Sequence, residues 1–374
     1  MARVLEFHVT GKKLLGGLLL TVVPISLAAI YLSGLVGERA ERDAGQDLQT
    51  IAESVASHIR ERVSAKVIEA ALMASDAAVQ EAVTEANRQY ERVYEEKLRE
   101  MLTARDDAWS TPAGQERAAA MLASPASEAL RKKLQVQPAL LRITVTDRRG
   151  GTVAATHKTI DYYQGDEEYW QDIFATGRGA VSLTDVLYDE ASKHYYIGVG
   201  VPVVDTSNNM TGTLDALVDI SQLFPLIHSN ELGTGGRMAL VHDDGTVITG
   251  TDGVSLSDRT VSEDFQAILD AQSQFGESSA GYVTAAFPQR RDRIVAFADT
   301  GLQQDHRRLN WFVVASQDAQ EALGEVALTQ FIILGLALLS LAAVVFLAVY
   351  FSLHTQSEIE EIEEQMAERP IISS

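Results

Sequence analysis

Aromatic and acidic side chains concentrate between residues 161 and 219, where together they could attract a cation. The set comprises Tyr162, Tyr163, Asp166, Glu167, Tyr169, Trp170, Asp185, Tyr188, Asp189, Asp215 and Asp219. A carboxylate pairs with a positive charge, and the face of an aromatic ring attracts the same charge. The alternative is that the tyrosines belong to an amphipathic core and the acids to a solvated loop. Asp215 and Asp219 are four residues apart in an expected strand, so both would project to one face.

Catalytic chemistry has little support elsewhere in the sequence. The chain contains no cysteine, which excludes disulfides, thiol nucleophiles and metal–thiolate sites. Its histidines show no pair at a spacing of three or four, so we expect no metal site. They are His8, His58, His157, His194, His228, His242, His306 and His354. No G-x-S-x-G motif or phosphate-binding loop occurs, and we therefore expect neither an enzyme nor a bound cofactor.

Two apolar segments frame the chain. Residues 14–36 and 331–353 each run 23 residues without a charge, enough for a helix to span a hydrocarbon core of ~30 Å. Arg3, Lys12 and Lys13 precede the first segment and predict a cytoplasmic N-terminus. The alternative for this segment is a cleaved signal peptide, although the apolar core of such peptides is shorter. We expect a two-pass protein of the cell membrane, with residues 37–328 extracytoplasmic.

The stretch after the first apolar segment has a helical period. Residues 38 to about 105 lack proline and carry apolar residues at spacings of three and four, which predicts one long helix. Such a helix must lie along a partner copy, the domain it serves, or both. We expect a homodimer through this stalk and the membrane helices. Residues 112–136 predict a further helical stretch that is broken at Pro125.

After Pro138 the period alternates as in strands. A strand–turn–strand pattern at residues 141–155 is followed by a polar, aromatic insert and two more strands, and the same order begins again at residue 238. The tripeptide Gly-Thr-Val starts at Gly151 and again at Gly245. The repeated order predicts two copies of one α+β module, each with an antiparallel sheet.

The charge and the short C-terminal tail limit the partners. A formal net charge of −21 disfavours nucleic acid and anionic lipid head groups. Only 21 residues follow Leu353, too few for a kinase, cyclase or methyl-accepting domain. The chain is then either a sensor subunit that couples to a separate cytoplasmic signalling protein or a truncated receptor. Ile359, Ile362 and Met366 suggest a short amphipathic helix that pairs with another protein, the alternative being a solvated acidic tail.

Five segments, taken in order, resemble the double Cache family of extracytoplasmic sensors. They are residues 72–79 (LMASDAAV), 169–177 (YWQDIFATG), 201–205 (VPVVD), 212–220 (GTLDALVDI) and 310–317 (NWFVVASQ). The resemblance covers residues 38–328. It implies two PAS-like modules stacked along the long helix, with a small molecule bound in the membrane-distal module.

The resemblance also implies a set of ligand-binding residues. Family members that bind amino acids hold the carboxylate with an arginine two residues before a Trp-Tyr pair, and the ammonium with aromatic rings and an aspartate. Here the pair falls on Tyr169 and Trp170 in swapped order, the aspartate on Asp219, and the arginine position on Glu167. An acidic group at that position favours a cationic or neutral ligand over a free carboxylate. The expected ligand-binding residues are Tyr162, Tyr163, Glu167, Tyr169, Trp170, Asp185, Tyr188, Asp189 and Asp219.

A membrane-bound small-molecule sensor that passes a conformational signal through its membrane helices is therefore the favoured function. A membrane-anchored solute-binding or scaffold protein without a signalling role is the alternative, and an ectoenzyme is less favoured. The expected boundaries are a cytoplasmic N-terminus at 1–13, a transmembrane helix at 14–36, a helical stalk at 37–136, a membrane-distal Cache module at 137–228, a membrane-proximal one at 229–328, a second transmembrane helix at 329–353 and a cytoplasmic tail at 354–374.

Overall fold

The computed structural model describes residues 11–367 except 176–179, 190–192, 229–231, 233–234, 277, 288–290, 305 and 307. The chain divides into two compact units. One contains both apolar helices, and the other contains residues 45–288 and 293–317. Arg3 and His8 lie outside the described residues, as do the side chains of the tail residues Ile359, Ile362 and Met366.

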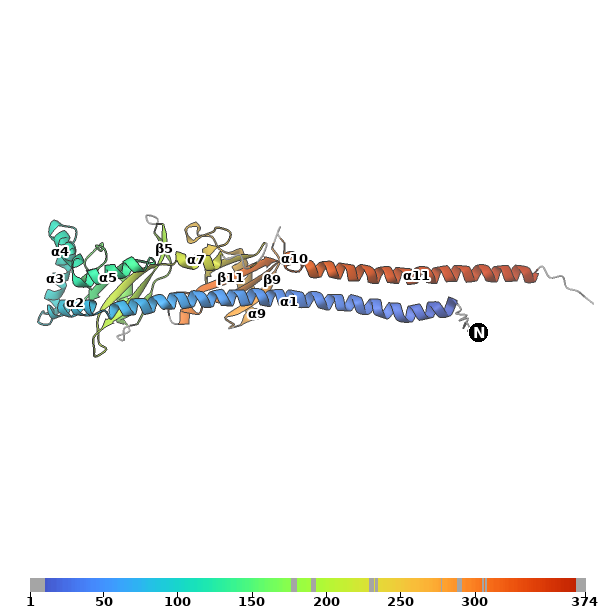
Figure 1. Cartoon of the computed structure of the whole chain (residues 1–374), viewed down its shortest axis with the longest axis horizontal. Helices are drawn as coiled ribbons and strands as arrows, with labels where there is room; N and C mark the ends of the chain where they lie inside the picture. The colour runs from blue at the N-terminus through green and yellow to red at the C-terminus, as the bar shows by residue number, and fades with distance from the viewer. Residues whose placement is uncertain are drawn as a thin grey trace, which may run out of the picture. The chain divides into compact units, whose positions relative to one another are not determined.

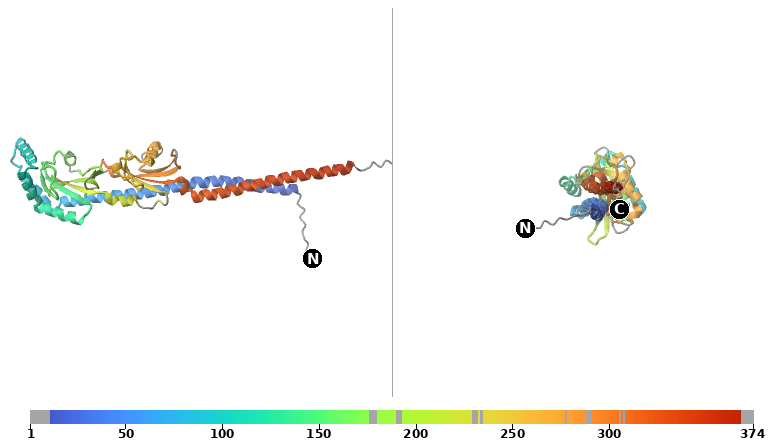
Figure 2. Two further views of the ribbon diagram at one scale, coloured as in Figure 1. Left: turned by 90° about the horizontal axis from the view of Figure 1, so that it is seen from above. Right: turned by 90° about the vertical axis from the view of Figure 1, so that its right-hand side faces the viewer.

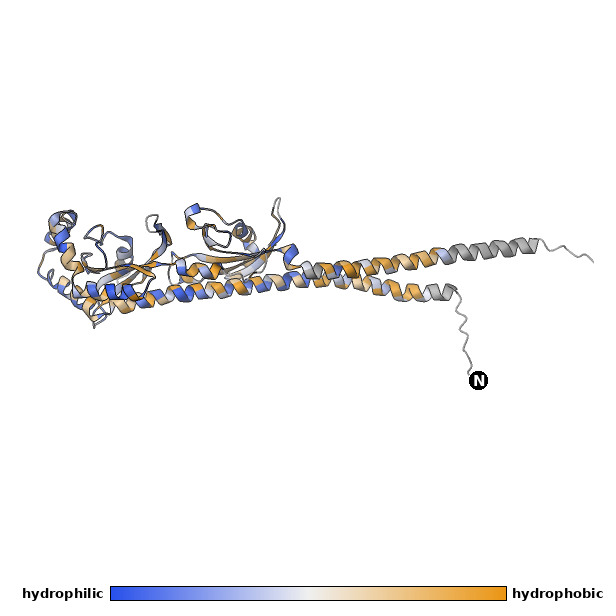
Figure 3. Ribbon diagram, turned by 45° about the horizontal axis from the view of Figure 1, so that its top comes forward, coloured by the Kyte–Doolittle hydropathy of each residue, from blue (hydrophilic) through white to orange (hydrophobic). Residues whose placement is uncertain are grey.

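The first unit is built on two long helices, α1 (Gly11–Ala74), which continues into the second unit, and α11 (Gly324–Ala367), with the short α10 (Ala319–Ala322) before the latter. Both long helices have stretches apolar enough to cross a membrane (Figure 3). These stretches lie side by side (Figure 2), because Ser26 Oγ and Ser340 Oγ are 2.7 Å apart and Gln330 Nε2 donates to Ser33 O at 2.9 Å. Small and hydroxyl-bearing residues at a contact are typical of packed membrane helices.

The second unit begins with the last turns of α1 and contains two sheets (Figure 1). We call the part built on the first sheet the first module. Its helices are α2 (Ala77–Arg88), α3 (Glu95–Asp107), α4 (Pro112–Leu122), α5 (Pro125–Val136), α6 (Glu168–Ala175), η1 (Ser221–Leu223) and α7 (Phe224–Ile227). Its strands are β1 (Leu140–Asp147), β2 (Thr152–Ala155), β3 (Ser182–Leu183), β4 (Leu187–Asp189), β5 (His194–Val204) and β6 (Met210–Asp219). The antiparallel sheet has the order β2-β1-β6-β5-β3, with β4 also paired to β5.

The second module repeats this plan. Its strands are β7 (Arg237–His242), β8 (Val247–Gly250), β9 (Ala280–Ala285), β10 (Arg293–Asp299) and β11 (Trp311–Asp318). Its helices are η3 (Leu256–Asp258), α8 (Glu263–Asp270), α9 (Gln272–Phe275) and η4 (Leu302–Gln304). The sheet order is β8-β7-β11-β10-β9, so a hairpin again lies beside the last strand of its module. Phe265 of α8 packs onto this sheet against Val241, Val295 and Val314.

The α+β class, the long N-terminal helix and the two antiparallel sheets predicted from the sequence are confirmed. The helices expected after Thr111 and Ser124 also form, each with a proline in its first turn and a side-chain N-cap. The predicted end of the long helix near residue 105 was wrong, because α1 ends at Ala74. Asp76 adopts an extended conformation there and its carboxylate accepts from Ala78 N, which begins a new helix.

Candidate functional site

The two faces of the first sheet differ in polarity. On one face, the central strands β1 and β6 bury Ile143, Val145, Leu214 and Ala216, and helices α2 and α5 pack against β1. On the other face, Arg142, Thr144 and Asp215 follow the alternate positions, and Thr144 pairs with Asp215 across the two strands. A buried polar face in the middle of a module is a candidate binding surface.

Helix α6 covers this polar face. Its Ile173 and Tyr169 are buried, and two glycines of β5 let neighbouring groups approach the sheet closely. A Cβ added at Gly200 would lie 3.0 Å from Ile173 Cδ1, and one added at Gly198 would lie 3.1 Å from Thr184 Cγ2. The Thr184 hydroxyl accepts from Gly198 N at 2.6 Å. The region between α6 and β1, β6 and β5 is therefore the candidate site.

Asp215 is the acidic group of this site. Its side chain is 7% exposed, and its carboxylate makes no hydrogen bond or ion pair with any residue that the structure describes. Burial raises the pKa of Asp215 to about 6, with Arg142 acting in the opposite direction and Glu167 adding to the rise. A buried carboxylate without a protein partner favours either a bound proton or a bound cation.

Arg142 is the basic group on the same face. Its Nε is buried and has no hydrogen-bond partner among the described residues. Its charge lowers the pKa of Asp215 and of Glu167, yet no ion pair joins it to either carboxylate in the described part of the chain. The site thus holds two opposite charges that are near enough to influence each other but are not paired.

Two of the expected ligand-binding residues belong to this site. Burial raises the pKa of the Tyr169 hydroxyl, and Asp215 raises it further; the hydroxyl also lies 3.4 Å from Gln164 Oε1. Glu167 is largely exposed at the start of α6, and partial burial together with Asp161 raises the pKa of its carboxyl. Tyr169 and Glu167 are therefore close enough to Asp215 and Arg142 to interact with them electrostatically.

Three other expected residues lie on the side of the module that faces α3. Tyr162 is buried beside Trp109, with ring centroids 5.5 Å apart. Tyr162 N and Tyr163 N both donate to Asp106 Oδ1, at 2.8 and 2.9 Å. Tyr163 and Trp170 line a separate pocket of about 430 Å³. Tyr162 is thus part of a hydrophobic core, while Tyr163 and Trp170 lie at a second surface.

Three further expected residues gather at the ends of β4, β5 and β6. Tyr188 packs on Tyr195, with ring centroids 4.6 Å apart. Asp189 of β4 lies opposite His194 of β5 in the backbone register of the sheet. Asp219 accepts a hydrogen bond from, or pairs with, His194 Nδ1 at 2.9 Å. Its carboxylate has protein partners, whereas that of Asp215 has none among the residues that the structure describes.

The ninth expected residue, Asp185, contacts the second module. Its Oδ1 accepts from Trp311 Nε1 at 3.2 Å, and its Oδ2 lies 3.5 Å from His242 Nδ1. Trp311 is fully buried at the start of β11. Asp185 therefore joins the two modules.

Helix α6 also contacts the second module, through Arg308. Arg308 Nη1 lies 2.6 Å from Glu168 Oε2, and Nη2 lies 3.0 Å from Asp172 Oδ2. Asp172 Oδ2 also accepts from the Ser182 hydroxyl at 3.1 Å. The helix over the candidate site is thus tied to the segment that leads into β11.

Among the described residues, no group of three or more histidines and carboxylates could hold a metal ion.

The fold, with a long N-terminal helix and two antiparallel sheets, is of the α+β class found in sensor domains. The chain belongs to the Cache domain family, which matches residues 37–326 and confirms the double Cache resemblance. Domains of this family are extracytoplasmic ligand-binding sensors, and the present one is accompanied by two candidate membrane helices.

Solved structures of chemoreceptor domains are similar to this chain. The sensory domain of the Campylobacter jejuni chemoreceptor Tlp3 (CcmL) is 12% identical, with a TM-score of 0.50 over 77% of this chain and 99% of that one. The ligand-binding domain of Tlp3 in complex with L-valine is 12% identical, with a TM-score of 0.48 over 77% of this chain and 98% of that one. The ligand-binding domain of the Pseudomonas aeruginosa PAO1 chemoreceptor PctB in complex with L-Arg is 15% identical, with a TM-score of 0.45 over 76% of this chain and 92% of that one. The first of these likenesses shows the fold alone. No curated protein sequence matches the chain.

Proposed function

We propose that this protein is a two-pass membrane sensor whose first module binds a small zwitterion, such as an amino acid, between Asp215 and Arg142. The observation that carries the proposal is the pair of opposite charges on one buried face, neither of which has an ion-pair partner among the described residues. An ammonium group would pair with Asp215 and a carboxylate with the guanidinium of Arg142.

Arg142 changes the ligand class expected from the sequence. The preference for a cationic or neutral ligand rested on Glu167 at the position of the family's arginine. Arg142 comes from a different strand and supplies a guanidinium on the same face as Asp215. A purely cationic ligand would satisfy Asp215 but would leave the buried Nε of the partly buried Arg142 without a hydrogen-bond partner.

Calorimetry on the full chain in lipid nanodiscs tests this ligand class. A panel of common amino acids is titrated first, followed by two analogues of the tightest one, the amine without its carboxylate and the acid without its ammonium. We expect the amino acid to bind at least about 30-fold more tightly than either analogue, the effect of removing one partner of a buried charge pair. Equal binding of the amine would favour the cationic ligand instead.

The signal is proposed to pass from α6 through Arg308 to β11, and then along the chain into α11 and a separate cytoplasmic partner. Because the chain lacks cysteine, a Ser26→Cys/Ser340→Cys variant reports on the membrane helices without background. Ligand should change the rate at which this disulfide forms. An unchanged rate in the presence of a bound ligand would favour the alternative, a membrane-anchored solute-binding or scaffold protein.

A homodimer through the stalk is part of this proposal. Ile68 and Leu72 lie one turn apart on α1 and are 61% and 68% exposed, which favours burial against a second copy. An Ile68→Cys variant should form a disulfide-linked dimer in the membrane, and Glu53→Cys, exposed on the same helix, serves as the comparison. Equal cross-linking at both positions would indicate random collision. Labelling of single cysteines from either side of the membrane tests the proposed external position of residues 37–328.

A further inference from the structure

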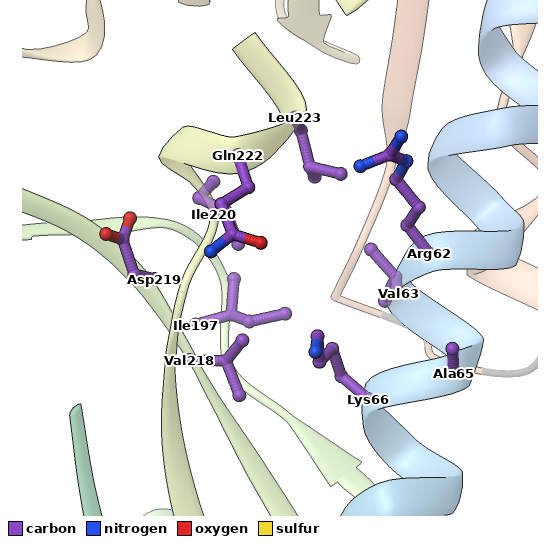
Figure 4. Close-up of a pocket in the computed structure, with 10 residues that line it drawn as sticks. All are labelled: Arg62, Val63, Ala65, Lys66, Ile197, Val218, Asp219, Ile220, Gln222 and Leu223. Atoms are coloured by element: carbon purple, nitrogen blue, oxygen red, sulfur yellow. The ribbon is translucent and has the colours of Figure 1, made fainter. Parts of the chain in front are cut away.

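A cavity lies on the opposite side of the first sheet, beside α1. It has a volume of about 190 Å³ and is separate from the site of Asp215 and Arg142. Its apolar wall consists of Val63, Ala65, Ile197, Val218, Ile220 and Leu223. Figure 4 shows α1 on one side of this cavity and η1 with the ends of β5 and β6 on the other. The cavity therefore lies where the stalk helix passes the sheet.

The polar groups at this cavity are mainly basic. Arg62 and Lys66 come from consecutive turns of α1, and the Gln222 amide faces them from η1 (Figure 4). Arg62 is exposed to solvent and makes no ion pair with any described residue, while Lys66 Nζ lies 2.9 Å from Glu69 Oε2. Asp219 is at the rim, but its carboxylate lies on the far side of the strand and is held by His194. A guanidinium and an ammonium group thus lie beside an apolar wall, with the guanidinium at its solvent side.

We propose that this cavity is a second ligand site, which takes a small monocarboxylate with an apolar body. The carboxylate would lie between Arg62 and Lys66 and accept from the Gln222 amide, and the hydrocarbon part would pack on Ile197 and Val218. The volume is about six times the ~30 Å³ that one water occupies in the liquid, which suits an acid of six or seven non-hydrogen atoms.

A monocarboxylate fits better than the other small ligands that the walls could accept. An amine would meet two positive groups, and a dicarboxylate would bring its second charge against Ile197 and Val218, where no donor is present among the lining residues. A neutral hydrocarbon would make no use of the Arg62 and Lys66 charges at the mouth of the cavity. A bound acid would join α1 to η1, the two elements that form the opposite walls.

Saturation-transfer NMR on the full chain in nanodiscs tests the proposal with three probes of one skeleton: isovalerate, isovaleramide and 3-methylbutylamine. Empty nanodiscs measure partition into lipid. We expect isovalerate to bind with a dissociation constant near ~1 mM, as its small size allows, and the amide and amine to bind at least about tenfold more weakly. Equal binding of acid and amide would show an apolar cavity without an anion site.

Charge variants assign the binding to this cavity. Arg62→Gln and Lys66→Gln should each weaken isovalerate binding about tenfold, whereas Arg92→Gln, an exposed arginine that lines none of the described pockets, should not. Glu69→Gln frees the Lys66 ammonium and should strengthen binding, by up to about fivefold. Unchanged binding in Arg62→Gln would overturn the proposal.

The two ligand sites are distinguished by variants of the first. Asp215→Asn and Arg142→Gln should leave isovalerate binding unchanged, and a saturating amino acid should not displace isovalerate. Loss of isovalerate binding in Asp215→Asn, with Arg62→Gln unaffected, would place the acid in the site under α6 and exclude a second site.

Discussion

Replacing Asp215 by asparagine should stabilise the protein and at the same time abolish tight ligand binding. The magnitude follows from its burial, which raises its pKa from 3.8 to about 6. Each unit of pKa shift corresponds to about 1.4 kcal/mol. The ionised carboxylate therefore lowers the free energy of unfolding by up to about 3 kcal/mol, a penalty that asparagine, which cannot ionise, does not incur.

The pH dependence gives this effect a defined sign. Because the native state binds the Asp215 proton more tightly than the unfolded chain does, this group causes stability to fall as pH rises from about 4 to about 6. Above that range the loss is complete. Asp215→Asn should exceed the wild type by up to about 3 kcal/mol at pH 8, and the excess should vanish near pH 4.

Thermal unfolding of the full chain in nanodiscs measures the effect. For a domain of this size, 1 kcal/mol moves the midpoint by about 2–4 °C, so the variant should melt up to about 10 °C higher at pH 8. Calorimetry at the same pH should show at least about a 30-fold loss of affinity for the amino acid. Damage to packing would instead lower both the melting midpoint and the affinity for the amino acid.

Asp219→Asn is the matched control on the same strand. Its carboxylate accepts from Ser221 N at 2.7 Å and contacts His194, so asparagine should weaken these bonds and lower the midpoint. If Asp215→Asn melts below the wild type at pH 8, its carboxylate has a stabilising partner and the reasoning fails. Unchanged amino-acid affinity in Asp215→Asn would refute the placement of the ammonium.

Three further substitutions test other parts of the structure. Arg142→Gln should weaken amino-acid binding at least about 30-fold in calorimetry but hardly affect the matching amine, and equal losses would contradict its role with the carboxylate. Arg308→Gln should reduce the effect of ligand on Ser26→Cys/Ser340→Cys cross-linking, and an undiminished effect would remove α6 from the signal path. Trp109→Ala should lower the free energy of unfolding by about 3–5 kcal/mol in denaturant titrations, because its side chain is 1% exposed. The control Tyr94→Ala, at a residue that is 87% exposed, should change it by less than about 0.5 kcal/mol. Similar losses in both variants would argue against a hydrophobic core around Trp109.

Local patterns predicted much of the fold. Pro112 and Pro125 mark helix starts because proline suits the first turn of a helix, and the repeated strand–turn–strand pattern that begins at residue 238 forms β7 and β8. The end of α1 was missed because Asp76 lies in a run rich in alanine, where helix propensity continues on both sides. The signal was the aspartate itself, which is a strong N-cap residue.

The site was less predictable, because it depends on contacts that a single strand does not reveal. Strand alternation correctly placed Asp215 and Asp219 on one face, but not that Asp215 is covered by α6 while Asp219 is held by His194. Arg142 was missed because it lies 20 residues before the nearest expected site residue, Tyr162. The alternation of residues 141–145 placed it on a sheet face, and only the β1–β6 pairing brings it beside Asp215.

Ligand affinity and signal output should depend on the same ion pairs, because coupling between two equilibria is reciprocal. If ligand binding weakens the contacts of Arg308 with Glu168 and Asp172, breaking them by Arg308→Gln must strengthen ligand binding by the same factor. Both pairs are partly exposed, so each contributes at most about 1 kcal/mol, and together they limit this factor to about 30. A larger change would require other contacts between the modules, such as the bond from the buried Trp311 Nε1 to Asp185. An affinity unchanged by Arg308→Gln would mean that these ion pairs hold the modules together in the same way with and without ligand.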